Sequence, residues 1–463
     1  MGWDNWNAFG CSVSESLLLS QARLISSLGL RDIGYEYVVL DDCWSSGRDA
    51  NGSLIADATK FPRGMAAVAQ EIHAMGLKFG MYSSAGKYTC GMYEGSLGHE
   101  QSDAHTFASW GVDYLKYDNC YNQGQAGNQL LSYTRYKAMS DALLSTGREM
   151  LYSLCNWGED FPWNWGSTIS NSWRISGDVY DSFDRPDDRC PCDGPDAFNC
   201  ELPGFHCSIL NIINKASFIV SKAQPGAWND LDILTVGLGG MTDAEYVTHF
   251  SLWAAAKSPL LTGADFTKIT PKTLSIFSNA AVVAVNQDPQ GSSAARRWHK
   301  TLANDTNQWG SPSQQQMWSG SLNSTTGDEN DMVVILINGA STAQKMEATL
   351  QDIFIDSGTG NTAPQVKMAW EVRDLWAYRM TDNEARYIIS NNNTVGYNGT
   401  SYYYNATKTS YAEGLQNKEE LLLGKMISTV KPSGTVTATV DRHGAAMFRL
   451  RAVPTGKAEK REL

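Results

Sequence analysis

Eight short apolar runs, each ending in polar residues, recur along the first two thirds of this 463-residue chain. They cover residues 2–6, 37–42, 79–83, 114–118, 150–154, 173–178, 227–230 and 259–263. Such runs are typical of buried β-strands. Between most of them apolar residues recur at helical spacing, as in 14–28, 65–75, 101–110, 207–222 and 242–256, and Ser14 and Thr242 are suitable helix N-caps. Eight strand-then-helix units predict an α/β fold, the (β/α)8 TIM barrel, whose active site lies at the carboxyl ends of the strands.

The chain changes character after Asp288-Pro289. Residues 286–295 are rich in Asn, Asp, Pro, Gly and Ser, which is typical of a linker or turn. Short β-rich runs without clear helical periodicity follow, for example 332–337, 365–372, 434–440 and 445–450. We therefore expect a catalytic barrel over residues 1–292 and a C-terminal antiparallel β-sandwich over residues 293–463.

Charge and hydropathy exclude several classes of partner. The net charge of −12 and the pI near 5.1 argue against nucleic acid or an anionic membrane surface. No run of about 20 apolar residues is present, so no segment is expected to span a membrane. The sequence contains no signal peptide, but it begins within its first predicted strand, which leaves room for a leader segment upstream.

Nine cysteines and six Asn-X-Ser/Thr sequons favour a secreted protein in the extracellular or cell-wall space. The sequons are at Asn51, Asn304, Asn323, Asn392, Asn398 and Asn405. Cys11 and Cys43 follow neighbouring strands, as do Cys90 and Cys120, so each pair could form a disulfide bond. Cys155 lies inside an apolar run and is expected to be a buried, unreactive thiol.

Four further cysteines, Cys190, Cys192, Cys200 and Cys207, lie close together in the sequence beside His206. Zinc binding is one interpretation of this cluster. However, the Cys-X-Cys spacing is tighter than in the usual zinc motifs, and an oxidising compartment favours disulfides. We therefore predict that the protein binds no metal.

Asp118 is the strongest catalytic candidate. It closes the run 114–118, and Lys116 lies two residues before it on the same face, because side chains alternate along a strand. The ammonium group would keep Asp118 ionised and fit for nucleophilic attack. A structural ion pair is the commoner interpretation of an isolated Lys-X-Asp, but the position at a barrel strand end favours catalysis.

The second carboxylate has several candidates, all of which are expected to end strands: Asp41, Asp42, Asp178, Asp230, Asp232 and Asp265. Asp178 stands out because an acidic, loop-like stretch follows it. Close to an ionised Asp118, its pKa would be raised and it could act as a general acid. Arg174, four residues earlier, could orient a hydroxyl or carboxylate. Asp41 and Asp42 are adjacent, so at most one should face the barrel mouth unless the strand ends there.

Tryptophans concentrate at or near the predicted strand ends, at positions 3, 6, 44, 157, 163, 165, 173 and 228. Any single tryptophan is more often part of a core than of a binding surface. Together with carboxylates, however, they suit a sugar, whose C–H faces pack on aromatic rings while its hydroxyls bond to acids. The cluster indicates a carbohydrate substrate.

Five motifs resemble those of one known family. They are Met1-Gly2-Trp3-Asp4-Asn5-Trp6-Asn7, Leu40-Asp41-Asp42-Cys43-Trp44, Phe79-Gly80-Met81-Tyr82-Ser83, Tyr114-Leu115-Lys116-Tyr117-Asp118-Asn119-Cys120 and Trp228-Asn229-Asp230. They look like the α-galactosidases of glycoside hydrolase family 27, and the Cys190-Pro191-Cys192-Asp193-Gly194 loop is similar to that of the yeast melibiases. The resemblance implies a retaining exo-α-galactosidase without a cofactor, acting on oligosaccharides such as melibiose and raffinose. It leaves room for a homo-oligomer.

The resemblance also implies roles for individual residues. Asp118 would be the nucleophile and Asp178 the acid/base. The residues that would bind galactose or line its pocket are Asp41, Asp42, Lys116, Arg174, Trp6, Tyr82, Trp157 and the bridge between Cys90 and Cys120. The implied disulfides are Cys11–Cys43, Cys90–Cys120, Cys190–Cys207 and Cys192–Cys200, which leaves Cys155 free. Ile233 occupies a position that varies among relatives, so the leaving-group preference stays open.

Two alternatives remain. An α-N-acetylgalactosaminidase of the same family needs small residues after the fifth strand to admit the 2-acetamido group, and the large Trp157 argues against it. A sugar-binding barrel without turnover would not need both Asp118 and Asp178. If the two carboxyls act as a retaining pair, they should stand about 5–5.5 Å apart.

Overall fold

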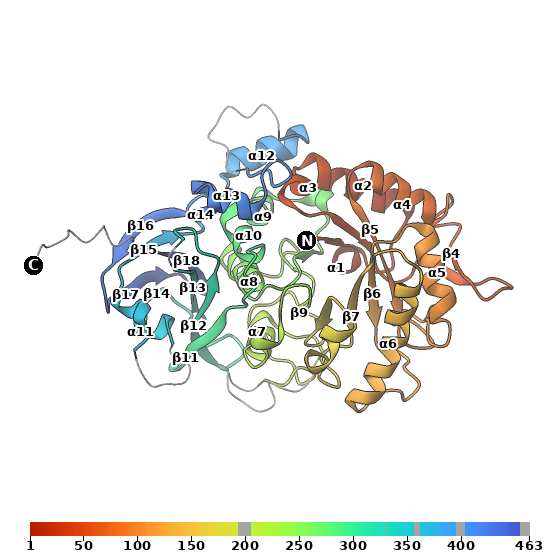
Figure 1. The fold of residues 1–463 in the computed structure, drawn as a ribbon, viewed down its shortest axis with the longest axis horizontal. Helices are drawn as coiled ribbons and strands as arrows, with labels where there is room; N and C mark the ends of the chain where they lie inside the picture. Colours follow the sequence, from red (N-terminus) through yellow and green to blue (C-terminus); the bar gives the residue numbers. More distant parts are fainter. Residues whose placement is uncertain (193–204, 328, 356–361, 395–402, 454–463) are drawn as a thin grey trace, which may run out of the picture.

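The computed structural model describes residues 1–192, 205–327, 329–355, 362–394 and 403–453. Its centre is a parallel sheet of eight strands in the order β10-β1-β2-β5-β6-β7-β8-β9. Their bounds are β1 Gly2–Asp4, β2 Tyr37–Leu40, β5 Lys78–Ser84, β6 Tyr114–Asp118, β7 Leu151–Cys155, β8 Ser172–Arg174, β9 Trp228–Asp230 and β10 Leu261–Thr262. A parallel bridge from Leu234, just after β9, to Thr262 closes the ring. The predicted eight-stranded barrel is confirmed (Figure 1).

Helices surround the barrel. They are α1 Trp6–Phe9, α2 Glu15–Ser27, α3 Leu30–Ile33, α4 Met65–Ala74, α5 Glu100–Trp110, α6 Gln129–Ser145, α7 Ile209–Ala216, α8 Asp243–Ala255, α9 Pro271–Phe277 and α10 Ala280–Asn286. Both predicted N-caps are confirmed, because Ser14 Oγ accepts a hydrogen bond from Leu17 N, and Thr242 forms a capping box with Glu245. Leu18, Ala22 and Ile25 lie on one face of α2 and are buried in the core, as their spacing predicts. A small hairpin of β3 (Ser45–Arg48) and β4 (Leu54–Ala56) follows β2.

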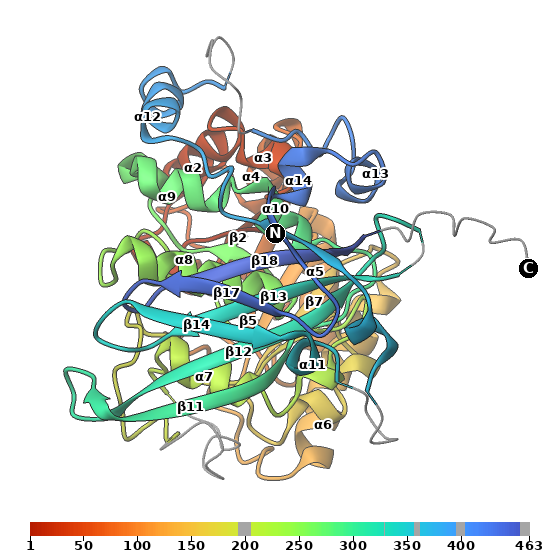
Figure 2. The same ribbon diagram turned by 90° about the vertical axis from the view of Figure 1, so that its left-hand side faces the viewer.

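The C-terminal region contains two antiparallel sheets. The larger has the order β11-β12-β13-β18-β15-β16, and the smaller pairs β14 with β17. The bounds are β11 Ala295–Thr306, β12 Pro312–Leu322, β13 Asp331–Asn338, β14 Gln344–Thr349, β15 Trp370–Asp374, β16 Lys425–Val430, β17 Thr435–Val440 and β18 Ala445–Ala452. Met346 of β14 and Val436 of β17 pack with Val334 and Leu450 in one core. The sheets lie face to face as a β-sandwich beside the barrel (Figure 2).

Four short helices interrupt this β region: α11 Leu350–Ile353, α12 Asp382–Asn391, α13 Tyr411–Gln416 and α14 Glu420–Leu423. The expectation of β-runs alone was therefore wrong. Helix α12 packs on α9 of the barrel, and α14 packs on α10 (Figure 1). Tyr411 Oη donates a hydrogen bond to Ile33 O at 2.9 Å. The two regions thus share an extensive interface. None of the helices in the described ranges is long and apolar enough to cross a membrane.

Candidate active site

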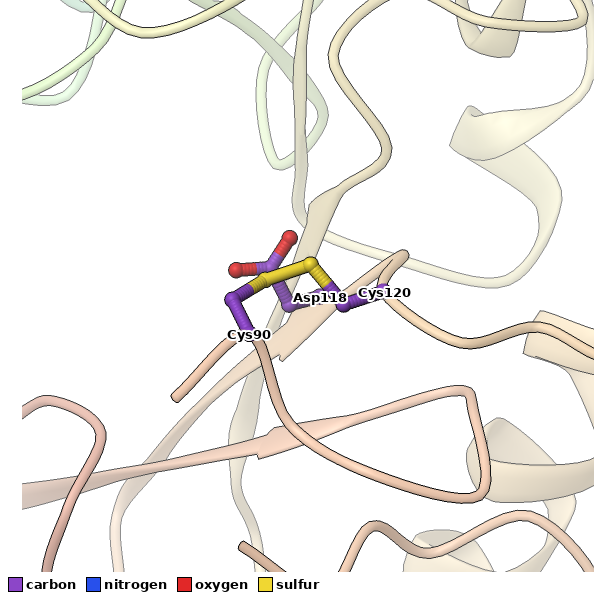
Figure 3. A group of neighbouring side chains, drawn as sticks. All are labelled: Cys90, Asp118 and Cys120. Carbon is purple, nitrogen blue, oxygen red and sulfur yellow. A yellow bond between two sulfur atoms is a disulfide. The ribbon is translucent and has the colours of Figure 1, made fainter. Parts of the chain in front are cut away.

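Asp118 is the last residue of β6, at the carboxyl end of the barrel, and only 6 % of its surface is exposed. Tyr82 Oη donates a hydrogen bond to its Oδ2 at 2.9 Å, and Asn119 N donates to its Oδ1 at 2.8 Å. The Cys90–Cys120 disulfide lies against the same carboxylate, with an oxygen and both sulfurs within 4.8 Å of one another (Figure 3). Two donors and a rigid bridge therefore fix the orientation of this carboxylate.

The charge state of Asp118 differs from the sequence-based expectation. Burial raises its pKa to about 7, although Lys116 acts in the opposite direction. The ammonium of Lys116 forms its ion pair with Asp41, at 2.7 Å from Oδ2. Asp41 approaches from the loop after β2, a contact that the Lys-X-Asp pattern could not show. At neutral pH Lys116 therefore keeps Asp118 only partly ionised.

Asp178 lies in the loop after β8, four residues beyond the strand end, and its side chain is 63 % exposed at the barrel mouth. The expected rise in its pKa was wrong. Desolvation raises the pKa of Asp178, but the charges of Arg174 and Lys116 and the hydrogen bond from Arg174 together lower it below the ordinary value. Arg174 Nη2 lies 3.1 Å from Asp178 Oδ1 and 2.8 Å from Asp232 Oδ2. The guanidinium thus holds two carboxylates at one side of the pocket.

Asp41 and Asp42 follow β2, which ends at Leu40, and both are buried. Because the strand has ended, the alternation that would separate the two side chains does not apply. Asp42 Oδ2 accepts a hydrogen bond from Gly91 N at 2.7 Å, next to the Cys90–Cys120 bridge. Lys116 Nζ lies 5.6 Å from the centroid of the Tyr82 ring. These contacts bring Asp41, Asp42, Lys116 and Tyr82 into one pocket wall.

Asp4 belongs to the same charged cluster, and the sequence analysis did not single it out. It is fully buried at the end of β1, and within the described part its Oδ2 has no hydrogen-bond partner. Burial and the neighbouring Asp41 raise its pKa well above the ordinary value. The sequence did contain a sign of this role, because Asp4 is an acidic residue at the end of the first predicted strand. Of the other acidic candidates, Asp230 accepts from Asp232 N, whereas Asp265 caps a short helical turn after β10 and bonds Gln21.

The loop after β7 is held in an unusual backbone conformation. Trp157, Asp160 and Phe161 have φ near +55°, and a side chain at Gly158 would meet Ile175 O at 2.3 Å. Left-handed conformations of large residues are costly and concentrate at functional sites. Glu159 accepts a hydrogen bond from Asn119 Nδ2 at 2.7 Å, which ties the loop to the residue after Asp118. Trp157 is half-buried, and its ring centroid lies 5.6 Å from that of Phe205.

The tryptophans divide into two groups. Trp3, Trp44 and Trp173 lie in the hydrophobic core, and their indole N–H groups donate to Ala264 O, Tyr82 O and Asn229 Oδ1. Trp165 is also buried. For these residues the expectation of a sugar-facing cluster was wrong. Trp6, Trp157, Trp163 and Trp228 are partly exposed.

The structure forms three of the implied disulfides: Cys11–Cys43, Cys90–Cys120 and Cys190–Cys207. The implied Cys192–Cys200 pair involves Cys200, which lies outside the described residues. Cys155 is a free, buried thiol, 3.5 Å from Arg174 Nη1. Since Cys190 and Cys207 are bonded to each other, they are not available as zinc ligands. The sulfurs of Cys90 and Cys120, beside Asp118, are likewise bonded to each other.

The sequons differ in accessibility. Asn51, Asn304 and Asn392 are exposed, whereas Asn323 and Asn405 are half-buried. Asn405 Nδ2 donates to Asp32 Oδ2 at 3.2 Å, so its amide is engaged at the interface with the barrel. Asn398 lies outside the described residues.

Comparison with known proteins identifies the family. Residues 1–188 and 205–288 match the model described as α-galactosidase A, and residues 312–403 match the α-galactosidase C-terminal β-sandwich domain. An α-galactosidase of Lachancea cidri is 54 % identical over 97 % of this chain and 93 % of its own length, and α-galactosidase 6 of Saccharomyces cerevisiae is 52 % identical over the same shares. This chain belongs to the α-galactosidases of glycoside hydrolase family 27.

Solved structures agree with this assignment. An α-galactosidase from Saccharomyces cerevisiae matches with a TM-score of 0.92 and 51 % identity, over 98 % of this chain and 97 % of the other, and it has also been determined with raffinose. A family 27 β-L-arabinopyranosidase from Geobacillus stearothermophilus, 19 % identical over 99 % of this chain and 97 % of its own, shares the fold with a TM-score of 0.68. As a family 27 member, this chain is a glycoside hydrolase.

Proposed function

We propose that this chain is a retaining exo-α-galactosidase that removes terminal, non-reducing α-D-galactosyl residues from oligosaccharides such as melibiose and raffinose. The observation that carries the proposal is the buried Asp118 carboxylate. It is oriented by Tyr82 and Asn119 at a barrel strand end, with Asp178 in the loop at the mouth. The yeast relative whose structure was determined with raffinose supports this substrate class.

The reaction proceeds by double displacement. In the first step an oxygen of Asp118 forms a bond to the anomeric carbon while the glycosidic C–O bond breaks, and Asp178 gives its proton to the departing oxygen. In the second step Asp178 takes a proton from water, and the resulting oxygen nucleophile releases galactose from Asp118. The lowered pKa of Asp178 beside Arg174 keeps it ionised, which is the state in which it can accept a proton in the second step.

Buried charges support the proposed action on a chain end. Asp41 and Lys116 form an ion pair next to the Tyr82 ring, and Asp41 also acts on Asp4, so we infer that the pocket ends at this cluster and takes a single terminal sugar. Asp41, Asp42, Lys116 and Arg174 offer acceptors and donors for the hydroxyls of one galactosyl residue. The half-buried Trp157, Trp6 and the Cys90–Cys120 bridge line the remaining wall.

We also infer the cellular setting and the domain boundary. The disulfides and the exposed sequons Asn51, Asn304 and Asn392 suit a secreted glycoprotein. Helix α10 ends at Asn286 and β11 begins at Ala295, which supports a boundary between a barrel over residues 1–292 and a sandwich over 293–463.

A pair of chromogenic substrates tests the proposal. The protein should release the chromophore from an α-galactoside but not from the corresponding α-N-acetylgalactosaminide, because the large Trp157 in the loop after β7 argues against a pocket that admits an acetamido group. Asp118→Asn should lower turnover by several orders of magnitude, since no covalent intermediate can form. Its thermal unfolding should stay cooperative, because an amide oxygen can still accept from Asn119 N.

Asp141→Asn is the matched control, because Asp141 is an exposed acid on α6 paired with Lys137. It should retain full activity. Near-normal turnover by Asp118→Asn, or hydrolysis of the N-acetylgalactosaminide at a similar rate, would show that the proposed function is wrong.

A further inference from the structure

A second concave site lies between the loop that follows Asp178 and the β-sandwich. It is a groove with a volume of about 410 Å³. One wall consists of residues 184–192 and the start of α7, and the other consists of β11, β12 and the turn that joins them. Both ribbon views show α7 beside these two strands (Figures 1 and 2). The groove is therefore formed jointly by the barrel and the sandwich.

Uncharged polar side chains dominate the lining of this groove. They are the amides of Asn211, Asn307 and Gln314 and the hydroxyls of Thr301, Ser311 and Ser313. Asp184, Asp187 and Asp188 add carboxylates, and Arg189 neutralises Asp187 at 2.9 Å. None of the described lining residues is lysine or arginine. This composition disfavours anions and suits a neutral ligand rich in hydroxyls.

A hydrogen-bonded network holds the floor of the groove in place. Asn214, which is 1 % exposed, accepts at Oδ1 from Gln316 Nε2 at 2.8 Å and from Arg296 Nη1 at 3.0 Å. Its Nδ2 donates to Gln314 Oε1 at 3.4 Å. The oxygen of Gln314 is thus engaged, whereas no bond within the described part uses its Nε2 donors, which are left for a ligand.

The β11–β12 turn carries an exposed tryptophan, which lies in the sequence between two residues that line the groove. Asn307 Oδ1 accepts from Trp309 N at 3.0 Å and from Ser311 N at 2.9 Å, and Asn307 Nδ2 donates to Asp184 O at 3.3 Å. One side chain therefore organises the turn and attaches it to the opposite wall. Trp309, between two lining residues, remains 47 % exposed. The exposed indole of this turn offers a face on which a sugar could stack, and the hydroxyls and amides of the groove offer hydrogen bonds, which are the two requirements of a sugar-binding surface.

We propose that this groove is a second carbohydrate-binding site, which takes the neutral hexose backbone of a galactose-bearing polysaccharide such as galactomannan. The proposal rests on the proposed function for the substrate class. Cys190 lines the groove and is bonded to Cys207, whose backbone N donates to Asp178 O at 2.8 Å. One disulfide thus links the groove wall to the catalytic loop, so the groove holds a polysaccharide near the active site and raises its local concentration there.

Native gel electrophoresis through galactomannan tests the site directly. Excess galactose in the gel fills the active site and suppresses hydrolysis, so any remaining retardation reports a second site. The wild-type chain should still be retarded, and the double variant Trp309→Ala/Gln314→Ala should lose this retardation. Phe218→Ala is the control, because Phe218 is another exposed aromatic, 39 % accessible, outside the groove, and it should behave as wild type.

Kinetics provide the second readout. For the double variant, kcat/KM on a small chromogenic α-galactoside should be unchanged, whereas on galactomannan it should fall about fivefold through lost stacking. The single variant Trp309→Phe, which keeps an aromatic ring, should retain much of the wild-type activity on galactomannan. If the wild-type chain were not retarded in the presence of galactose, or if the double variant were retarded as strongly as the wild type, the proposed second carbohydrate site would be wrong. The proposed α-galactosidase function would not be affected. Retardation in galactose without hydrolysis of the small galactoside would overturn the proposed function instead.

Discussion

Asp118 and Asp178 act on each other electrostatically, and the pKa of each is shifted against its role in the first chemical step. That step needs an ionised Asp118 and a protonated Asp178, whereas the pKa of Asp118 is raised and that of Asp178 is lowered. Burial favours a proton on Asp118, and Arg174 favours an ionised Asp178. Two interacting carboxyls titrate as a pair, so what matters for catalysis is that the pair carries one proton. A bound sugar would cover the exposed Asp178 and remove its water, which raises its pKa and moves the proton to it.

This view predicts the basic limb of the pH profile. The pKa of Asp118 is about 7, and above this pH both carboxyls are ionised and no acid remains, so kcat/KM on melibiose should fall. Asp178→Asn should lose far more rate on melibiose than on a substrate with a good leaving group, and on the latter the basic limb should disappear. Rates on both substrates, measured across the pH range, check this. Equal losses on both would assign the acid to another residue.

Helices and strands that bury their apolar residues at regular spacing were predictable from the sequence. An element that exposes apolar residues and buries a charged one was not. Most barrel strands contain apolar residues, because both faces of the sheet are covered, and each is followed by polar residues, so they could be located from this pattern. Helix α6 was missed because Leu130 and Leu144 are exposed while Arg135 is buried. Arg135 donates to Ala85 O and to Asn119 Oδ1, so it braces the active-site loops. A functional constraint has replaced the usual periodicity in this helix.

The loops after β5 and β6 depend on their disulfide, and this gives a prediction. The double variant Cys90→Ser/Cys120→Ser should lose stability by roughly 3–4 kcal/mol, the loop-closure value for a bridge across about 30 residues. It should also lose activity, because the bridge contacts Asp118 and positions Gly91 N against Asp42. Cys155→Ser should lower only the stability, through poorer packing around a buried free thiol, and should leave activity unchanged. Denaturant unfolding and turnover of the three proteins check this, and an active, equally stable double variant would contradict it.

At the scale of the whole molecule, the sandwich supports the active site of the barrel. His443, on the turn between β17 and β18, lies 2.6 Å from Glu245 of α8 and stacks on Phe183 at 4.6 Å, in the loop that carries Asp178. Contacts between residues about 200 positions apart leave no local pattern. The sequence therefore predicted both architectures and the place of Asp118 at the end of its strand. It placed Asp178 at a strand end as well, although Asp178 lies in the loop four residues beyond, and it did not predict the Lys116–Asp41 pair.

The separation of the two carboxyls stays a prediction, and the stereochemistry of the product tests it most directly. A retaining pair about 5–5.5 Å apart delivers water to the face from which the leaving group departed. Proton NMR of wild-type protein acting on melibiose should therefore show α-galactose first, with the β-anomer rising only through mutarotation. β-Galactose as the first-formed sugar would contradict the nucleophilic role of Asp118, even if the substrate class were right.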